Sequence, residues 1–169
     1  TPDTLVTLGD GNKMQICDVN IGDEVLTWNF YTGQYEVMPV SLLQAHDSGM
    51  LKVLYLFFDD GTTLKVLGEH GIFDAESKEF IFIDKDDACD YVGRKYLKQD
   101  GDGFTEVVLT SYDVVEENTT AYTILSVDHY NVLLEDLLTV TPAHVGGNFF
   151  NPFDINEDMK YDETSMKAD

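Results

Sequence analysis

The chain has 169 residues, which is most simply one domain with room for a sizeable hydrophobic core. Its 10 basic and 32 acidic residues give a net charge of -22, a field that repels phosphate backbones and disfavours nucleic-acid binding. Its apolar fraction of 43% is typical of a globular protein, and no apolar run approaches the ~20 residues of a membrane-spanning helix. We therefore expect no nucleic acid and no membrane among its partners.

Short runs of alternating apolar and polar residues dominate the chain, as in half-buried β-strands. Turn pairs such as Asp10-Gly11, Thr32-Gly33 and Asp60-Gly61 separate them. The strands that we expect are residues 4–8, 13–17, 24–29, 34–40, 51–58, 63–66, 79–83, 105–111, 121–127 and 130–134. Many short strands at close spacing predict an all-β sandwich or barrel-like body.

A weak internal repeat accompanies these strands. Shifting the chain by 67 positions places residues 22–25 on residues 89–92, and Tyr55 on Tyr122. The same offset keeps strands and turns in phase from about residue 8 to residue 134, which indicates two copies of one unit.

Potential metal ligands form no convincing cluster in the sequence. The turn at residues 100–103 has two aspartates and two glycines, but it does not follow the twelve-residue calcium loop, so we expect an exposed hairpin turn. Cysteine and histidine are too scattered to predict zinc, and we expect no metal and no cofactor. We expect Cys17 and Cys89 to be small, half-buried side chains, and the sequence does not say whether they form a disulfide.

The composition changes after residue 141. Residues 142–169 contain Gly146-Gly147 and a charged end, which are typical of loop, and also Phe149, Phe150 and Phe153, which are too apolar for a free linker. We expect them to be a docked tail or the start of a following segment. Because Thr1 opens directly into a strand-forming run, we also expect the chain to be a piece of a longer polypeptide.

The opening block carries a family resemblance. Residues 3–28 read DTxVxLxDGxxxxIxDVxxGDxVLxW, which resembles the start of a Hint domain, the self-processing unit shared by inteins, Hedgehog C-terminal domains and bacterial intein-like proteins. The resemblance covers residues 1–141. It implies an all-β, two-lobed, pseudo-twofold horseshoe of short strands, with residues 4–8 at its centre. It also implies a catalytic cysteine close to the start, and the residue two places upstream of Thr1 is where it would stand.

In Hint domains that cysteine attacks the carbonyl before it in an N-to-S acyl shift, and a nearby imidazole supplies a proton to the leaving nitrogen. The family places this histidine in a T-x-x-H pattern after a strand. Here the matching residues are 67–70, so the resemblance assigns the role to His70, with Leu67 in place of the threonine. The alternative is a surface-loop histidine beside Glu69.

The closing blocks of the family match residues 122–141 without gaps. Asn131 stands at the turn asparagine, Tyr130 stands where a histidine is usual, and Asp128 and His129 precede it. The resemblance therefore groups Asp128 and His129 with His70 near the backbone of Thr1 and Asp3. The terminal His-Asn pair, whose asparagine cyclises in splicing, becomes residues 140–141, Val-Thr, which cannot cyclise.

Two functional hypotheses follow. One is a degenerate Hint fold that serves as a structural or binding unit of a larger bacterial protein, extracellular or at the cell surface, without splicing. The other is an autoprocessing domain whose nucleophilic cysteine lies just upstream of Thr1. In both cases the expected partners are the flanking segments of its own polypeptide, and we expect a monomer.

Overall fold

The structure is a computed structural model that describes residues 1–46, 48–67, 70–126, 129–140, 143–145 and 148–150. Its strands are β1 (Leu5–Thr7), β2 (Lys13–Gln15), β3 (Glu24–Asn29), β4 (Gln34–Pro39), β5 (Leu42–Ala45), β6 (Gly49–Phe58), β7 (Thr63–Val66), β8 (Gly71–Asp74), β9 (Glu79–Phe82), β10 (Lys95–Asp100), β11 (Gly103–Thr119), β12 (Tyr122–Leu125), β13 (Val132–Leu134), β14 (Leu137–Val140), β15 (Ala143–Val145) and β16 (Asn148–Phe150). Two 3-10 turns, η1 (Ile16–Asp18) and η2 (Ala88–Tyr91), complete the described elements, none of which is an α-helix.

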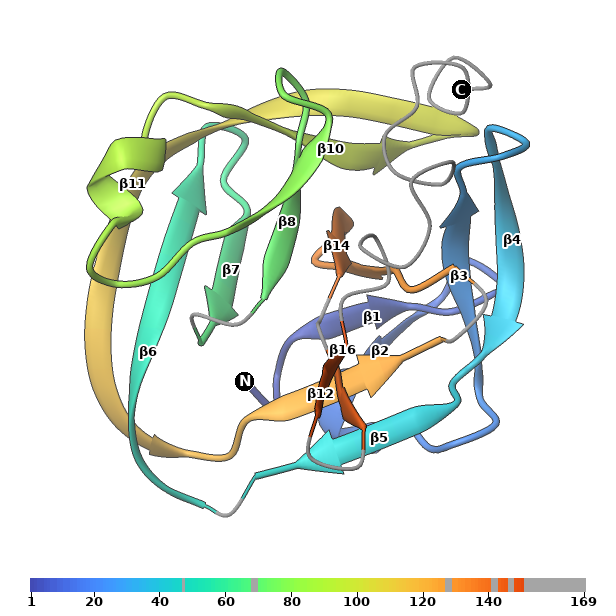
Figure 1. The fold of residues 1–169 in the computed structure, drawn as a ribbon, viewed down its shortest axis with the longest axis horizontal. Helices are drawn as coiled ribbons and strands as arrows, with labels where there is room; N and C mark the ends of the chain where they lie inside the picture. Colours follow the sequence, from blue (N-terminus) through green and yellow to red (C-terminus); the bar gives the residue numbers. More distant parts are fainter. Residues whose placement is uncertain (47, 68–69, 127–128, 141–142, 146–147, 151–169) are drawn as a thin grey trace.

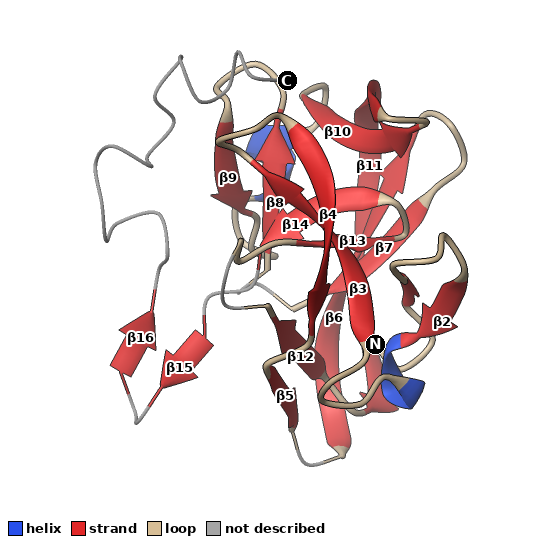
Figure 2. Ribbon diagram, turned by 90° about the vertical axis from the view of Figure 1, so that its right-hand side faces the viewer, coloured by secondary structure: helices blue, strands red, loops and turns tan. Residues whose placement is uncertain are grey.

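The largest sheet is strongly curled and runs in the order β2-β1-β13-β14-β8-β10-β11-β6-β7, with β9 added to β8. The hairpin of β3 and β4 and the pair β5–β12 form the opposite side of the ring in Figure 1, and β1 crosses between the two sides. Figure 2 shows the same strands edge-on and the small β15–β16 hairpin set apart from them. The predicted all-β, two-lobed horseshoe is confirmed.

The first strand lies where the resemblance places it. β1 is flanked by β2 and by β13, and Val6, which is fully buried, pairs with Leu134. The chain start therefore lies beside β13, although the two parts are far apart in sequence. This juxtaposition positions the candidate site.

Equivalent hydrogen bonds relate the two halves of the domain. After η1, the Gly22 N–H donates to the Val40 carbonyl at 2.9 Å and the Val40 N–H donates to Asp23 at 2.8 Å. After η2, the Gly93 N–H donates to the Leu109 carbonyl at 2.8 Å and the Leu109 N–H donates to Arg94 at 3.0 Å.

Both glycines have a φ of 93°, which is left-handed backbone that glycine adopts without a Cβ penalty. The β3–β4 and β10–β11 hairpins are thus equivalent. Gly22 and Gly93 are separated by 71 positions (93 − 22), not by the 67 that the sequence comparison suggested.

β11 is the longest strand and belongs to two pairings. Its first part pairs with β10, from Lys95↔Val108 to Asp100↔Gly103, and its second part pairs with β6 up to Thr119↔Gly49. Near the start of the pairing with β6, a register shift between Leu109 and Ser111 marks a bulge of the kind that bends a strand. The exposed turn predicted at residues 100–103 is confirmed as the β10–β11 hairpin turn.

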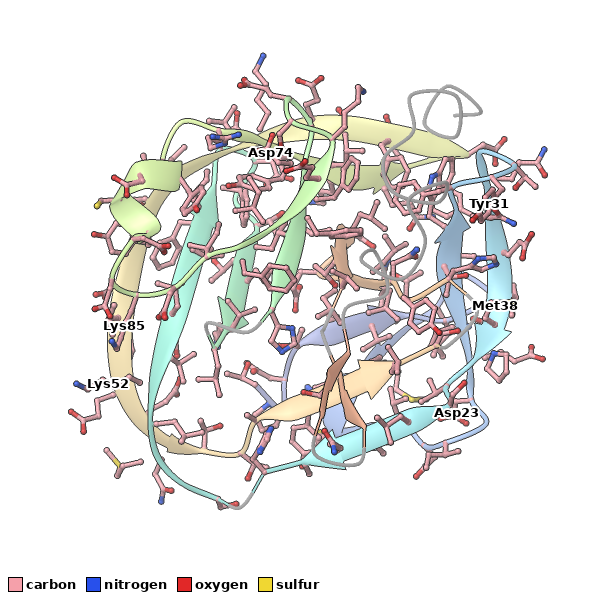
Figure 3. The ribbon with its side chains drawn as sticks, viewed as in Figure 1. Asp23, Tyr31, Met38, Lys52, Asp74 and Lys85 are labelled. Carbon is pink, nitrogen blue, oxygen red and sulfur yellow. The ribbon has the colours of Figure 1, made fainter. Side chains whose placement is uncertain are left out.

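The hydrophobic core has a main cluster and a smaller aromatic-rich one around Trp28 and Phe73. Trp28 contacts Tyr35 and Phe104 edge-on, with ring centroids 4.8 Å apart in each pair. Figure 3 shows Lys52 directed outward from β6. The buried Asp74 carboxylate accepts from Arg94 Nε at 2.5 Å and from the N–H groups of Glu76 and Ser77.

The exposure of the two cysteines differs from the expectation. Cys17 and Cys89 are both free and exposed, so the prediction of half-buried side chains was wrong. Each lies in a 3-10 turn whose buried position is taken by the preceding residue, Ile16 or Ala88.

Of the tail, the described residues include the strands β15 and β16, and residues 151–169 lie outside them. No helix in the described part of the chain has the length and apolarity to cross a membrane.

Candidate functional site

A small pocket lies where the chain start meets the end of β7 and the connection from β11 to β12. Its volume is about 20 Å³, which accommodates a water molecule. Its polar lining includes Thr1, Thr4, Lys65 and His70, and apolar side chains such as Val66, Leu67 and Leu134 complete the wall. The pocket therefore joins the first residue of the chain to the predicted catalytic histidine.

A dense set of hydrogen bonds surrounds Thr1. Its hydroxyl donates to Asp3 Oδ1 at 2.6 Å and lies 3.1 Å from the Thr4 hydroxyl. Its nitrogen lies 3.5 Å from the Lys65 carbonyl and 3.4 Å from Thr4 Oγ1. Partial burial lowers the pKa of this amino group below its ordinary value.

Lys65 and Asp3 form the ion pair at the edge of the pocket. Lys65 Nζ donates to Asp3 Oδ2 at 3.0 Å, and this hydrogen bond raises the pKa of the lysine. The hydrogen bond from Thr1 is the main cause of the lowered pKa of Asp3, and Lys65 adds to it. Both side chains are therefore charged at neutral pH.

His70 follows β7 and directly precedes β8, whose four residues are all buried. Its N–H donates to the Leu67 carbonyl at 3.3 Å, and His70 lines the pocket. As a whole residue, His70 is half-buried. Desolvation by burial, with a smaller effect of the Thr1 ammonium, lowers the pKa of His70 to about 4. The imidazole is thus neutral at pH 7.

Leu67 stands at the threonine position of the T-x-x-H pattern, and it lines the same pocket as His70. The wall next to the imidazole is therefore apolar at the place where the family has a hydroxyl. This side chain adds to the desolvation of His70 and offers no hydrogen bond to a peptide in the pocket.

His129 is directed to another part of the molecule. Its Nε2 lies 2.7 Å from Glu36 Oε2 on β4, and Glu36 also accepts from Asn29 Nδ2 at 2.7 Å. The hydrogen bond from Asn29, followed by that of His129, lowers the pKa of Glu36. His129 is absent from the described lining of the pocket, so the structure does not group it there with His70. Asp128 lies outside the described residues.

Asn131, the turn asparagine, is fully buried and bridges two segments. Its Oδ1 accepts from the Trp28 N–H at 2.7 Å, and its Nδ2 donates to the carbonyls of Trp28 at 2.8 Å and His129 at 3.0 Å. The side chain acts as a strand partner for β3, because it bonds both the N–H and the carbonyl of Trp28. Its role in this structure is to fix the loop before β13.

Two residues of the site were not singled out in the sequence. Thr4, which is buried, and Lys65 both contact Thr1, but threonine and lysine within alternating strands resemble ordinary strand residues. The available signal was position: Thr4 is one residue before β1, and Lys65 is two residues before Leu67. Only the pairing of distant strands shows that these positions meet.

No family model and no curated protein sequence matches the chain. Solved intein structures do match its fold. The DnaB intein from Synechocystis sp. PCC 6803 superposes with a TM-score of 0.71 at 15% identity, over 85% of this chain and 97% of that one.

The PabCDC21-1 intein gives a TM-score of 0.69 at 15% identity, over 83% of this chain and 96% of that one. The DnaX mini intein from Spirulina platensis gives 0.66 at 22% identity, over 83% and 98%. These likenesses span nearly the whole length of each intein and agree with the curled all-β architecture and the paired hairpins. By its fold, the chain is a Hint/intein-like domain.

Proposed function

We propose that this chain is a degenerate Hint-fold unit of a larger polypeptide and that it does not splice. The observation that carries the proposal is the end of β14. Val140, which stands where the family has the histidine that precedes the cyclising asparagine, is fully enclosed and pairs with Gly71. A buried valine cannot transfer a proton, and the following Thr141 has no side-chain amide with which to cyclise. Its partners would be the flanking segments of its own polypeptide.

A second candidate function is autoprocessing at the chain start, and the shared pocket of Thr1 and His70 favours it. In an acyl shift, the sulfur of a cysteine just upstream of Thr1 would attack the carbonyl carbon of the residue before it. The carbon–nitrogen bond breaks, a thioester forms, and the nitrogen becomes an amine. The imidazole of His70, which lines the same pocket as Thr1, would carry the thiol proton to that nitrogen. Its lowered pKa of about 4 makes it a weak base toward the thiol and, once protonated, a strong acid toward the nitrogen.

The test uses the chain between two reporter proteins. In one version a cysteine is placed two residues upstream of Thr1, and in the matched control an alanine stands there. We expect no ligated reporter product from either version, because the C-terminal step lacks its asparagine. Intact mass measured after long incubation gives the result, and a ligated product would contradict the proposal.

Dithiothreitol or hydroxylamine then tests the second candidate, because both release a thioester. Thiol-dependent loss of the upstream reporter from the cysteine version, absent from the alanine version and slowed by His70→Gln, would support autoprocessing. Equal stability of both versions would exclude it and leave the structural or binding role. The chain that begins at Thr1 should keep its mass of 19.0 kDa under the same conditions.

A further inference from the structure

Residues 1–3, which lead into β1, are held at the end of β7 by two groups of Lys65, its side-chain nitrogen and its carbonyl. Lys65 Nζ donates to Asp3 Oδ2 at 3.0 Å, and the Lys65 carbonyl faces the Thr1 nitrogen at 3.5 Å. The hydroxyl of Thr1 donates to the other oxygen of Asp3 at 2.6 Å, which closes the arrangement. Lys65 holds residues 1–3 and lies only five residues before His70 in the chain. The contact therefore links the start of the chain to the segment that carries the imidazole.

The Lys65 side chain is supported from the sheet behind it. Its Nζ lies 5.1 Å from the centroid of the Tyr55 ring, within the range of a cation–π contact, and Tyr55 is its direct cross-strand neighbour. The Tyr55 hydroxyl in turn donates to Glu117 Oε1 on β11 at 2.8 Å. Lys65 is thus oriented by two further strands, although 29% of its side chain stays exposed.

Because the ion pair of Lys65 and Asp3 is exposed, removing it should change the position of the segment before β1 more than the stability of the fold. The Asp3 side chain is 56% exposed, and ion pairs so open to solvent contribute little to the stability of a fold. The segment that they hold, however, lies before the first strand. Within it, the Thr4 N–H donates to the Thr1 carbonyl and the Cys17 N–H donates to the Pro2 carbonyl. Together with the Lys65 contacts and the bonds of Thr1 to Asp3 and Thr4, these hydrogen bonds define the direction in which the chain enters the pocket.

We propose that Lys65 is a positioning residue that fixes residues 1–3 beside His70, so that a peptide entering the domain reaches the imidazole in one orientation. This inference rests on the second candidate function, the acyl shift. In a chain extended before Thr1, the single peptide N–H of Thr1 would replace the ammonium that now faces the Lys65 carbonyl. Correct orientation of reacting groups accounts for large rate factors, and a displacement of about 1 Å costs up to about a hundredfold.

The kinetic test uses the cysteine-extended chain with Lys65→Met, Lys65→Arg and Asp3→Asn. We expect Lys65→Met to slow thiol-dependent cleavage about tenfold or more, with an unchanged unfolding midpoint. Lys65→Arg should restore most of the rate, because arginine keeps the charge and the hydrogen bond. Combining Lys65→Met with Asp3→Asn should be no slower than the slower single variant, because both remove the same contact. A cleavage rate that Lys65→Met leaves unchanged would overturn the inference.

A second measurement does not depend on cleavage. Amide hydrogen exchange at Thr4 and Cys17 reports on the held segment in the chain that begins at Thr1. We expect Lys65→Met to accelerate both several-fold, while the matched control Lys52→Met, on the outer face of β6, leaves them unchanged (Figure 3). If the extended chain never cleaves but exchange accelerates, the acyl shift fails and the positioning role stands. Unchanged exchange in Lys65→Met would show that Lys65 does not hold the segment.

Discussion

Replacing His70 by glutamine is expected to flatten the dependence of folding stability on pH between about pH 4 and about pH 6.5. Burial lowers the pKa of His70 from 6.5 to about 4 in the folded protein. Within this window the unfolded chain binds a proton that the folded chain excludes, so the wild-type protein loses stability as the pH falls. The shift corresponds to about 3 kcal/mol, and because His70 is only half-buried as a residue we expect a change of about 2 kcal/mol.

Urea unfolding at about pH 4.5 and about pH 7.5, followed by the fluorescence of the buried Trp28, measures the effect. The wild-type protein should lose more stability between the two conditions than His70→Gln, by the amount given above. The carboxylates near the pocket titrate in both proteins, so the difference isolates the imidazole. His46→Gln, which removes an exposed imidazole, is the matched control and should behave as wild type. Identical pH dependence in wild type and His70→Gln would mean that the folded protein accepts the proton on His70.

The second large effect is expected at Asn131. Asn131→Ala leaves the Trp28 N–H and two carbonyls without the partner that the buried amide provides. Each unsatisfied buried group costs about 1–3 kcal/mol, so the free energy of unfolding should fall by about 3 kcal/mol or more. Asn131→Asp keeps the shape of the side chain but places an acceptor opposite carbonyl oxygens, and it should destabilise the protein by a similar amount.

Asn118→Ala, at an exposed position on β11, is the control and should change stability by less than about 0.5 kcal/mol. Equilibrium urea unfolding of the three variants decides the matter. If Asn131→Ala unfolds at the wild-type midpoint, water replaces the amide without loss, and Asn131 does not act as a strand partner for Trp28. The expected result would show that this turn asparagine stabilises the fold through its hydrogen bonds.

Much of the first half of the fold could be predicted from the sequence because its signals are local. The strands β3, β6 and β7 were expected with nearly their observed bounds, since alternating residues and Asp-Gly turns specify them directly. β10 and the second part of β11 were missed because their residues are largely polar. Those segments become strands through pairing with distant partners, which no local pattern records.

In the candidate site too, one part could be predicted from the sequence and another could not. His70 was expected beside the chain start on the basis of the resemblance, and the two now line one pocket. His129 was grouped with it because the two occupy neighbouring blocks of the family, yet its ring faces Glu36 on β4. The backbone position of a residue followed from the family pattern, but the direction of its side chain depends on which carboxylates and amides the opposite strands supply. Such partners belong to the individual sequence. The catalytic roles of His70, Asp128 and His129 stay predictions.

The pairing of Val6 with Leu134 has a consequence for the timing of assembly. The two residues are 128 positions apart (134 − 6), so β1 leaves the ribosome long before its partner strand is made. Contacts this distant in sequence form late, after the entropy of closing a long loop has been overcome. The pocket around Thr1 therefore does not exist on a nascent chain. Any reaction there would have to wait until β13 has been synthesised and has docked, so completion of the domain would itself be the signal that starts the chemistry.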